Sequence, residues 1–473
     1  MFLPAPALAA LGNPLLLEQI GSGRMTKEGA LADVRARISS ALGVTPESPT
    51  TTGTASGAWR WVATLERGAS TWGAFQSALR TWESGVRASH PGAAQACRDF
   101  LAAPPPSSAA QPSPVELDEL AELALLGPGN VLLRAVQRVF GAGAGAAGAR
   151  DGEDPAVRRL GRLLSIAIHS LRTYLDAPEW HRFLRVDEGT VTSKRVGYPE
   201  VVRQAIWNGN LEATLDEYLV TLQGLGAVEP DDAEESAALD ALERALAIRD
   251  ALVRIHRLGT RASDSVGMRC HAAMPFGLSA SEVVDTTGAL RGDTLRVAFN
   301  SPFRPMVLAT TSIGQEGLDF HVYCRHVVHW DLPGNPIDLE QREGRVSRYG
   351  SLAVRSVLAA QIRELPRDRS PWHALSAKLE ERAGGLTPWW CVPGAAIQRS
   401  VFVPSFSSQA EDLADLEKAL ALYRLTLGQS DQEHLLRALE RRVDGEKDGD
   451  ARNAVREWLR TAAVLLSPGG RGP

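Results

Sequence analysis

Two closely spaced arginines offer the clearest chemistry in this chain. Arg345 and Arg348 stand in the octet Gln-Arg-Glu-Gly-Arg-Val-Ser-Arg, which Gln341 opens. On a helix these three residues fall at i, i+4 and i+7, so one amide and two guanidinium groups project from one stripe. Guanidinium groups are always charged and bind phosphoryl oxygens in a bidentate manner. The spacing predicts contact with a nucleotide γ-phosphate, although arginine pairs also occur on ordinary solvated helices.

The residues before the octet predict the helix that would carry it. Asn335 is a good N-cap residue, and Pro336 suits the first helical position. Asp338 and Glu340 then place acidic charge near the helix N-terminus. We therefore expect a helix that begins near Pro336 and runs through the octet.

Two apolar runs upstream predict strands of an α/β fold. The first is Met306 to Thr310, which a loop with glycines at 314 and 317 follows, and the second is Val327 to Trp330. Strand, glycine loop, strand and capped helix form an α/β pattern. Ligands of open parallel sheets bind at the carboxyl ends of the strands, so we expect the loop and the helix to share one face.

These residues resemble two ordered motifs of a known family. ATTSIGQEGLDFH, at 309 to 321, is similar to motif V of superfamily 2 helicases, and QREGRVSR, at 341 to 348, is similar to their motif VI. The run DLPGNPIDLEQREGR most resembles the branch that holds the Swi/Snf-like DNA translocases. The resemblance covers about residues 265 to 365 and implies the C-terminal RecA-like lobe of such a motor.

The resemblance also implies roles for individual residues. Arg345 and Arg348 would be the arginine fingers, and Gln341 would contact nucleotide or the neighbouring lobe. Gly317 and Asp319 would border the ribose and γ-phosphate side of the cleft. The short hydroxyl side chains after the first strand would touch a nucleic-acid backbone, a contact that carries no sequence information; these are Thr310, Thr311 and Ser312.

A complete motor of this family needs a second set of residues. It uses a GxxxxGK[ST] loop for phosphate and an acidic strand end for Mg²⁺, whereas this sequence has no Gly-Lys pair. We therefore expect ATP as the cofactor, with Mg²⁺ held by an N-terminal RecA-like lobe encoded upstream or by a separate ATPase subunit. The chain would be a helicase or ATPase only when completed in this way, with DNA, or RNA, as partner. The alternative is a noncatalytic orphan lobe or truncated gene product that binds protein or DNA.

Composition sets the wider frame. The 473 residues are 44% hydrophobic and 23% charged, with a net charge of −5, which describes a globular protein rather than a general nucleic-acid coat. No apolar run reaches membrane-spanning length. The four cysteines are scattered without CxxC pairing. His321, His326 and His329 surround Cys324, but His329 belongs to a strand ending and His321 follows the aspartate of the motif V-like run, so we expect no metal centre. The expected location is the cytoplasm.

The expected fold class is an α/β RecA-like parallel-sheet lobe combined with large, mainly α-helical regions. Helices are expected from Asp154–Pro155 onward, from about Ala233 to Leu258, before Gly428, and over about Ala451 to Leu466. The expected domains are a mainly helical region at 1–103, Pro- and Gly/Ala-rich linkers with one helix at 104–150, a helical bridge or insertion at 151–264, the RecA-like helicase lobe at 265–370, and a helical region at 371–473.

Overall fold

A computed structural model of the chain describes residues 1–17, 26–44, 57–106, 110–141, 154–176, 197–225, 231–247, 251–255, 266–270, 292–303, 305–310, 319–362, 366, 369–383, 387–390, 392–404, 407–426, 431–444 and 454. The chain forms two compact units. Unit 1 comprises Met1–Cys270, Pro302–Arg304 and Arg363–Lys378, and unit 2 comprises His271–Ser301, Pro305–Ile362 and Leu379–Pro473. The domain boundaries expected from composition stay predictions.

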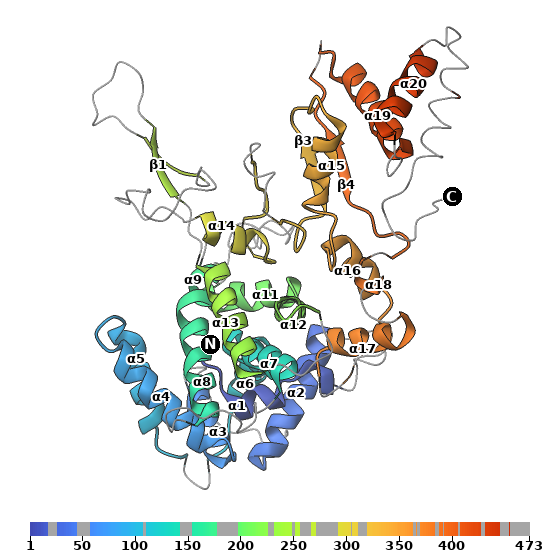
Figure 1. Ribbon diagram of the computed structural model, residues 1–473. Coiled ribbons are helices and arrows are strands. Elements are labelled where there is room, and N and C mark those ends of the chain that lie inside the picture. Colours follow the sequence, from blue (N-terminus) through green and yellow to red (C-terminus); the bar gives the residue numbers. More distant parts are fainter. Residues whose placement is uncertain are drawn as a thin grey trace. The chain divides into compact units, whose positions relative to one another are not determined.

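Unit 1 is built mainly of helices; those before residue 250 are coloured from blue to green in Figure 1, and α17 (Pro371–Ala383) is orange. Several of them begin with proline in the first turn, where the missing N–H costs nothing and the fixed φ suits a helix. Its helices are α1 (Pro6–Leu11), the 3₁₀ turn η1 (Pro14–Leu16), α2 (Lys27–Leu42), α3 (Ala58–Gly68), α4 (Trp72–Val86), α5 (Pro91–Ala102), α6 (Pro114–Leu126), α7 (Pro128–Phe140), α8 (Pro155–Ser165), the π-helical η4 (Ile166–Leu171), α9 (Arg172–Leu175), α11 (Tyr198–Asn208), α12 (Leu211–Leu222) and α13 (Asp232–Leu246), and α17 (Pro371–Ala383) begins in it.

Two helix predictions in unit 1 had different outcomes. The helix expected from Asp154–Pro155 is confirmed as α8, and the Asp154 side chain accepts the Ala156 N–H as its cap. The long helix expected to reach Leu258 is wrong in its second half, since α13 ends at Leu246. Strand β1 (Ala251–Ile255) follows and pairs antiparallel with β2 (Val266–Cys270). Backbone pairing with a segment further along the chain therefore outweighs the helical charge pattern there.

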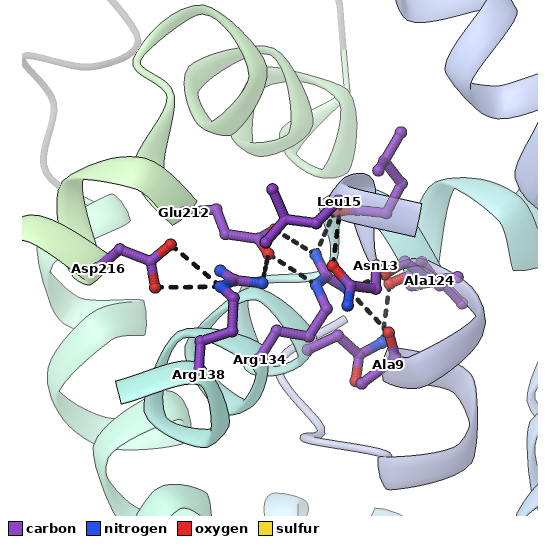
Figure 2. Close-up of polar contacts among 11 residues, drawn as sticks. Ala9, Asn13, Leu15, Ala124, Arg134, Arg138, Glu212 and Asp216 are labelled. Atoms are coloured by element: carbon purple, nitrogen blue, oxygen red, sulfur yellow. Dashed lines mark hydrogen bonds and ion pairs between the residues drawn. The ribbon is translucent and has the colours of Figure 1, made fainter. Parts of the chain in front are cut away.

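A buried group of four charged side chains joins α7 to α12 (Figure 2). The Arg134 guanidinium lies 2.6 Å from Glu212 and also donates to the Ala124 and Leu125 carbonyls near the end of α6. Arg138 contacts Glu212 at 2.6 Å and Asp216 at 3.1 Å. Every buried charge in this group has an opposite charge beside it, as burial of charge requires.

Unit 2 combines helices with a small parallel sheet (Figure 1). Strands β3 (His326–His329) and β4 (Gln398–Val401) pair in parallel. The helices of this unit are α14 (Gly292–Phe299), α15 (Pro336–Gly344), α16 (Leu352–Ala359), α18 (Thr387–Trp390), α19 (Gln409–Thr426) and α20 (Gln432–Asp444). The helix expected before Gly428 is confirmed as α19, whereas the one expected over about 451 to 466 lies outside the described residues, apart from residue 454.

The two strand predictions in unit 2 also differ in outcome. The run Val327 to Trp330 is confirmed as a strand, shifted by one residue to β3. Met306 to Thr310 is described without strand structure, and Met306 and Val307 are largely exposed, so that prediction is wrong. A strand needs a hydrogen-bonded neighbour, and β3 takes β4 as its partner. The chain is thus largely helical with a small parallel sheet.

Candidate functional site

Helix α15 positions the residues of the octet. The Asn335 side chain accepts the Ile337 N–H, and Pro336 opens the helix, so the predicted start is confirmed. The helix ends at Gly344, with Arg345 as its C-cap residue. The expectation that Gln341, Arg345 and Arg348 share a helical stripe is therefore wrong: Gln341 lies exposed in the last turn of α15, and Arg348 lies beyond the helix.

The two arginines nevertheless converge, because one carboxylate draws them together. Asp319 Oδ1 lies 3.0 Å from Arg348 Nη1 and 3.9 Å from Arg345 Nη1. The Arg348 Nε–H also donates to the Gly344 carbonyl at 2.9 Å, which holds its side chain against the end of α15. Arg345 is 17% exposed, and Arg348 and Asp319 are each about 40% exposed. Two cations thus share one anionic partner at the surface of unit 2.

The backbone on each side of this cluster is fixed by packing and hydrogen bonds. The Phe320 N–H donates to the Arg345 carbonyl at 3.0 Å, and the Asn300 side chain donates to the Asp319 carbonyl at 2.7 Å. Phe320 and Val346, the residues next to Asp319 and Arg345, pack with Phe299 in a buried apolar cluster. The core residues therefore set the separation of the polar residues beside them.

A fully buried arginine supports the segment after the cluster. Arg355, in α16, donates to the Gly350 and Val322 carbonyls, each at 2.6 Å, and its guanidinium lies 5.0 Å from the centre of the Tyr323 ring. Burial, with the charges of Arg348 and Arg355, lowers the pKa of His321, although Asp319 opposes this. His321 is therefore neutral near pH 7. Sequence reasoning missed Arg355; an arginine within the apolar run LAVRSVLA was the available signal.

Glu343 fixes α15 to the parallel sheet. Its carboxylate accepts from Arg399 of β4 at 2.6 and 2.7 Å, and its Oε1 lies 3.3 Å from His329 Nε2 of β3. Burial alone would raise the pKa of Glu343, but the hydrogen bonds from His329 and Arg399 hold it below its usual value. Glu343 is thus ionised and ties the last turn of α15, next to Arg345, to both strands. No sequence signal marked it for this role.

The remaining predicted site residues are placed as follows. Thr310 is described and exposed, whereas Thr311, Ser312 and Gly317 lie outside the described residues. The histidines near Cys324 have different partners: His326 contacts Ser400 at 2.8 Å, and His329 contacts Glu343. Within the described ranges, no group of three or more His, Cys, Asp or Glu side chains is arranged to hold a metal ion. No helix in the described part of the chain combines the length and apolarity needed to span a bilayer.

Comparisons with known proteins point to the same stretch of sequence. Residues 290–350 match the family described as helicase conserved C-terminal domain. The chain is 48% identical over 44 residues to the uncharacterized ATP-dependent helicase YqhH of Bacillus subtilis (strain 168), which covers 9% of this chain and 8% of YqhH. It is 34% identical over 94 residues to the RNA polymerase-associated protein RapA of Pseudomonas putida (strain W619), which covers 20% of this chain and 10% of RapA.

The matched part is short on both sides. The chain spans about a tenth of the length of these curated relatives. No solved structure matches the chain. The matched residues include α14, β3 and α15, and they also include Asp319, Arg345 and Arg348.

Proposed function

Residues 290–350 carry the C-terminal lobe segment of a superfamily 2 helicase, and from that premise we propose that this chain supplies the arginine fingers of an ATP-driven helicase or DNA translocase. Arg345 and Arg348 would contact the γ-phosphate of a nucleotide. A RecA-like lobe with a Walker A loop, outside the printed sequence or on another polypeptide, would cradle the remaining phosphates. The unit 2 segment would then be the RecA-like C-terminal lobe.

One observation carries this proposal: both guanidinium groups reach the same carboxylate oxygen of Asp319, at 3.0 and 3.9 Å. Two cations that share one anionic partner suit the clustered oxygens of a phosphoryl group. The cluster suits an anion, because two positively charged arginines face a single negative carboxylate. A divalent cation such as Mg²⁺ would need several oxygen ligands, so we assign it to the Walker lobe.

The exposure of the cluster makes exchange of partners inexpensive. Ion pairs at partly exposed sites are worth about 0 to 1 kcal/mol, so Arg345 and Arg348 would give up Asp319 for a phosphoryl oxygen at little cost. ATP supplies the γ-phosphoryl group, and negative charge on it is what the two guanidinium groups would stabilise. Asp319 would keep both side chains aimed at the site between turnovers. Gln341, exposed in the last turn of α15, would contact nucleotide or the partner lobe.

The nucleic-acid contact of this lobe is assigned to the segment after Val307. Thr310 is exposed there, and Thr311 and Ser312 follow it in sequence. Their hydroxyl groups would donate to phosphate oxygens, and Gly317 would border the nucleotide cleft with Asp319. The names of the relatives support the broader reading, since YqhH is called an ATP-dependent helicase and RapA an RNA polymerase-associated protein.

The test joins the chain to a Walker lobe. ATP hydrolysis is measured with the purified chain, with the product of the upstream reading frame, and with both together, each with and without DNA. We expect DNA-stimulated turnover only from the combination. Arg345→Ala or Arg348→Ala should lower kcat by about 10³ or more, because arginine fingers contribute at that scale, with little change in DNA affinity.

A matched arginine provides the control. Arg342 lies in α15, three residues before Arg345, but donates to the Asp331 carbonyl at 2.8 Å and is not paired with Asp319. Arg342→Ala should therefore keep kcat within about threefold of the parent, since no phosphoryl contact is lost. If the combination hydrolyses ATP and the Arg345 and Arg348 variants match the parent, the proposal is wrong. If no Walker-bearing product yields turnover, the chain is a noncatalytic binding module.

A further inference from the structure

Two exposed aromatic rings lie face to face at one end of the parallel sheet. The ring centres of Trp330 and Phe402 are 4.3 Å apart, and the ring planes differ by only 4°. Trp330 is 70% exposed, more than any other tryptophan that the structure describes, and Phe402 is 41% exposed. Rings of this size are usually buried or contact a partner, so this exposed aromatic platform, defined as Trp330 and Phe402, needs an explanation.

The platform is built into the sheet and is not a chance contact between loose side chains. Trp330 directly follows β3 and Phe402 directly follows β4, and the Phe402 N–H donates to the His329 carbonyl at 3.0 Å. His329 is buried and lies 3.3 Å from Glu343. The platform thus stands at the carboxyl ends of two parallel strands, where ligands of α/β sheets bind.

The chemistry around the rings selects the ligand. Asp331 directly follows Trp330, and its carboxylate is exposed. Arg342 donates to the backbone carbonyl of Asp331, and its Nη1 lies 3.9 Å from Asp331 Oδ1. Val328, two residues before Trp330 and therefore on the same face of the strand, is also exposed. The surface beside the platform thus combines an apolar side chain with an exposed carboxylate, which Arg342 faces at 3.9 Å. It suits the uncharged flat face of a nucleobase better than a phosphate group.

We propose that Trp330 and Phe402 form a stacking platform for an unpaired base of single-stranded nucleic acid, with the base extending the stack on the exposed ring face. This inference rests on the helicase form of the proposed function, because strand separation exposes unpaired bases. It adds a contact to the bases, whereas Thr310 to Ser312 would contact the backbone. Glu343 contacts His329 of β3 and Arg399 of β4, the two strands that end at the platform. Arg345 follows Glu343 by two residues, so the same contacts connect the platform to the arginine cluster.

The experiment measures binding without nucleotide or a partner lobe. Fluorescence anisotropy of a labelled oligothymidylate about 20 nucleotides long, longer than one such face covers, gives Kd for the full chain. Trp330→Ala and Phe402→Ala should each raise Kd about fivefold or more, as the loss of one base–aromatic stack predicts. Trp330→Phe should restore most of the affinity. Trp390→Ala is the control, because Trp390 is half exposed in the same unit but is not part of the platform.

An abasic oligonucleotide of equal length separates bases from phosphates. The Kd of the abasic strand for the parent should be about as high as the Kd of oligothymidylate for Trp330→Ala. The abasic strand should have the same Kd for the parent and for Trp330→Ala. Equal binding of abasic and thymidine strands, no effect of Trp330→Ala, or no binding by the parent would each overturn the proposal. If Trp330→Ala leaves Kd unchanged but changes the molecular mass measured by sedimentation, the platform contacts another protein chain and not a base. None of these outcomes depends on ATP turnover, so the arginine proposal stands or fails separately.

Discussion

Individual arginines in unit 2 do different work, although they are alike in sequence. Arg345 and Arg348 are partly exposed and face Asp319, so their charge is accessible to a ligand. Arg355 is fully buried, and its guanidinium donates hydrogen bonds to backbone carbonyls. The environment thus separates a binding arginine from a structural one. The sequence predicted the first kind from spacing. The signal for the second, an arginine within an apolar run, does not show which carbonyls that arginine binds.

Replacing Arg355 should therefore affect stability in a way that replacing Arg348 does not. Arg355→Met removes the donor to the Gly350 and Val322 carbonyls, and each buried group left unsatisfied costs about 1 to 3 kcal/mol. Arg348→Ala removes a partly exposed ion pair worth at most about 1 kcal/mol. Urea unfolding followed by circular dichroism measures both. Equal unfolding midpoints for the two variants would refute this assignment of roles.

At the scale of elements, local signals set where helices begin and distant contacts set where they end. Asn335 and Pro336 fixed the start of α15, but its end at Gly344 brings Arg348 back toward Asp319 in a turn. Helix α1 is an exception, because a distant residue caps its start. Its first-turn amides, from Ala7 and Leu8, donate at 3.1 and 2.9 Å to the Glu66 carboxylate of α3, a cap that comes from another helix.

The Glu66 cap makes a prediction about pH. Burial raises the pKa of Glu66 to about 7 from 4.5, although the two backbone N–H groups oppose this. Between these two values the folded chain holds a proton at Glu66 that the unfolded chain has lost, so the free energy of unfolding should fall as pH rises through this window and level off above it.

Glu66→Gln tests this prediction, since glutamine does not titrate. The difference in unfolding free energy between parent and Glu66→Gln should change across this window and stay constant above it. Other titrating groups are common to the proteins and cancel in the difference. A pH-independent difference for Glu66→Gln would show that burial does not raise the pKa of Glu66.

At the scale of the whole molecule, the helicase-like stretch is a small part of a largely helical chain. Unit 1 lies outside the matched residues except at Pro302–Arg304, and its core includes the buried charges of α7 and α12. A buried ion pair is a weak source of net stability, but removing one partner leaves an uncompensated charge. Removing Arg134 or Arg138 would therefore leave a carboxylate of that group with less compensation for its burial.

Removal of one of these charges should be severe. Arg134→Met leaves Glu212 short of one partner and takes a donor from the Ala124 and Leu125 carbonyls, which should cost about 3 to 5 kcal/mol. Arg162→Met, which removes an exposed arginine that pairs with Asp240 and Glu243, should cost about 1 kcal/mol or less. Differential scanning calorimetry measures both. A shift in Tm as small as that of Arg162→Met would show that the buried group is dispensable.

The sequence by itself determined the features that depend on a few neighbouring residues. The cap and proline at 335–336, the paired arginines and the two helicase-like motifs were all visible, and the helix start and the family resemblance follow from them. Each is a local property, because a cap acts within one turn and a motif is read along the chain.

Only the tertiary structure decided which distant residues meet. The pairing of β3 with β4, the stacking of Trp330 on Phe402 and the ties from Glu343 to Arg399 join segments far apart in the chain. Arg134 and Glu212 are separated by 78 positions and still share two hydrogen bonds. Such contacts depend on how whole elements pack, and no short window of sequence encodes that packing.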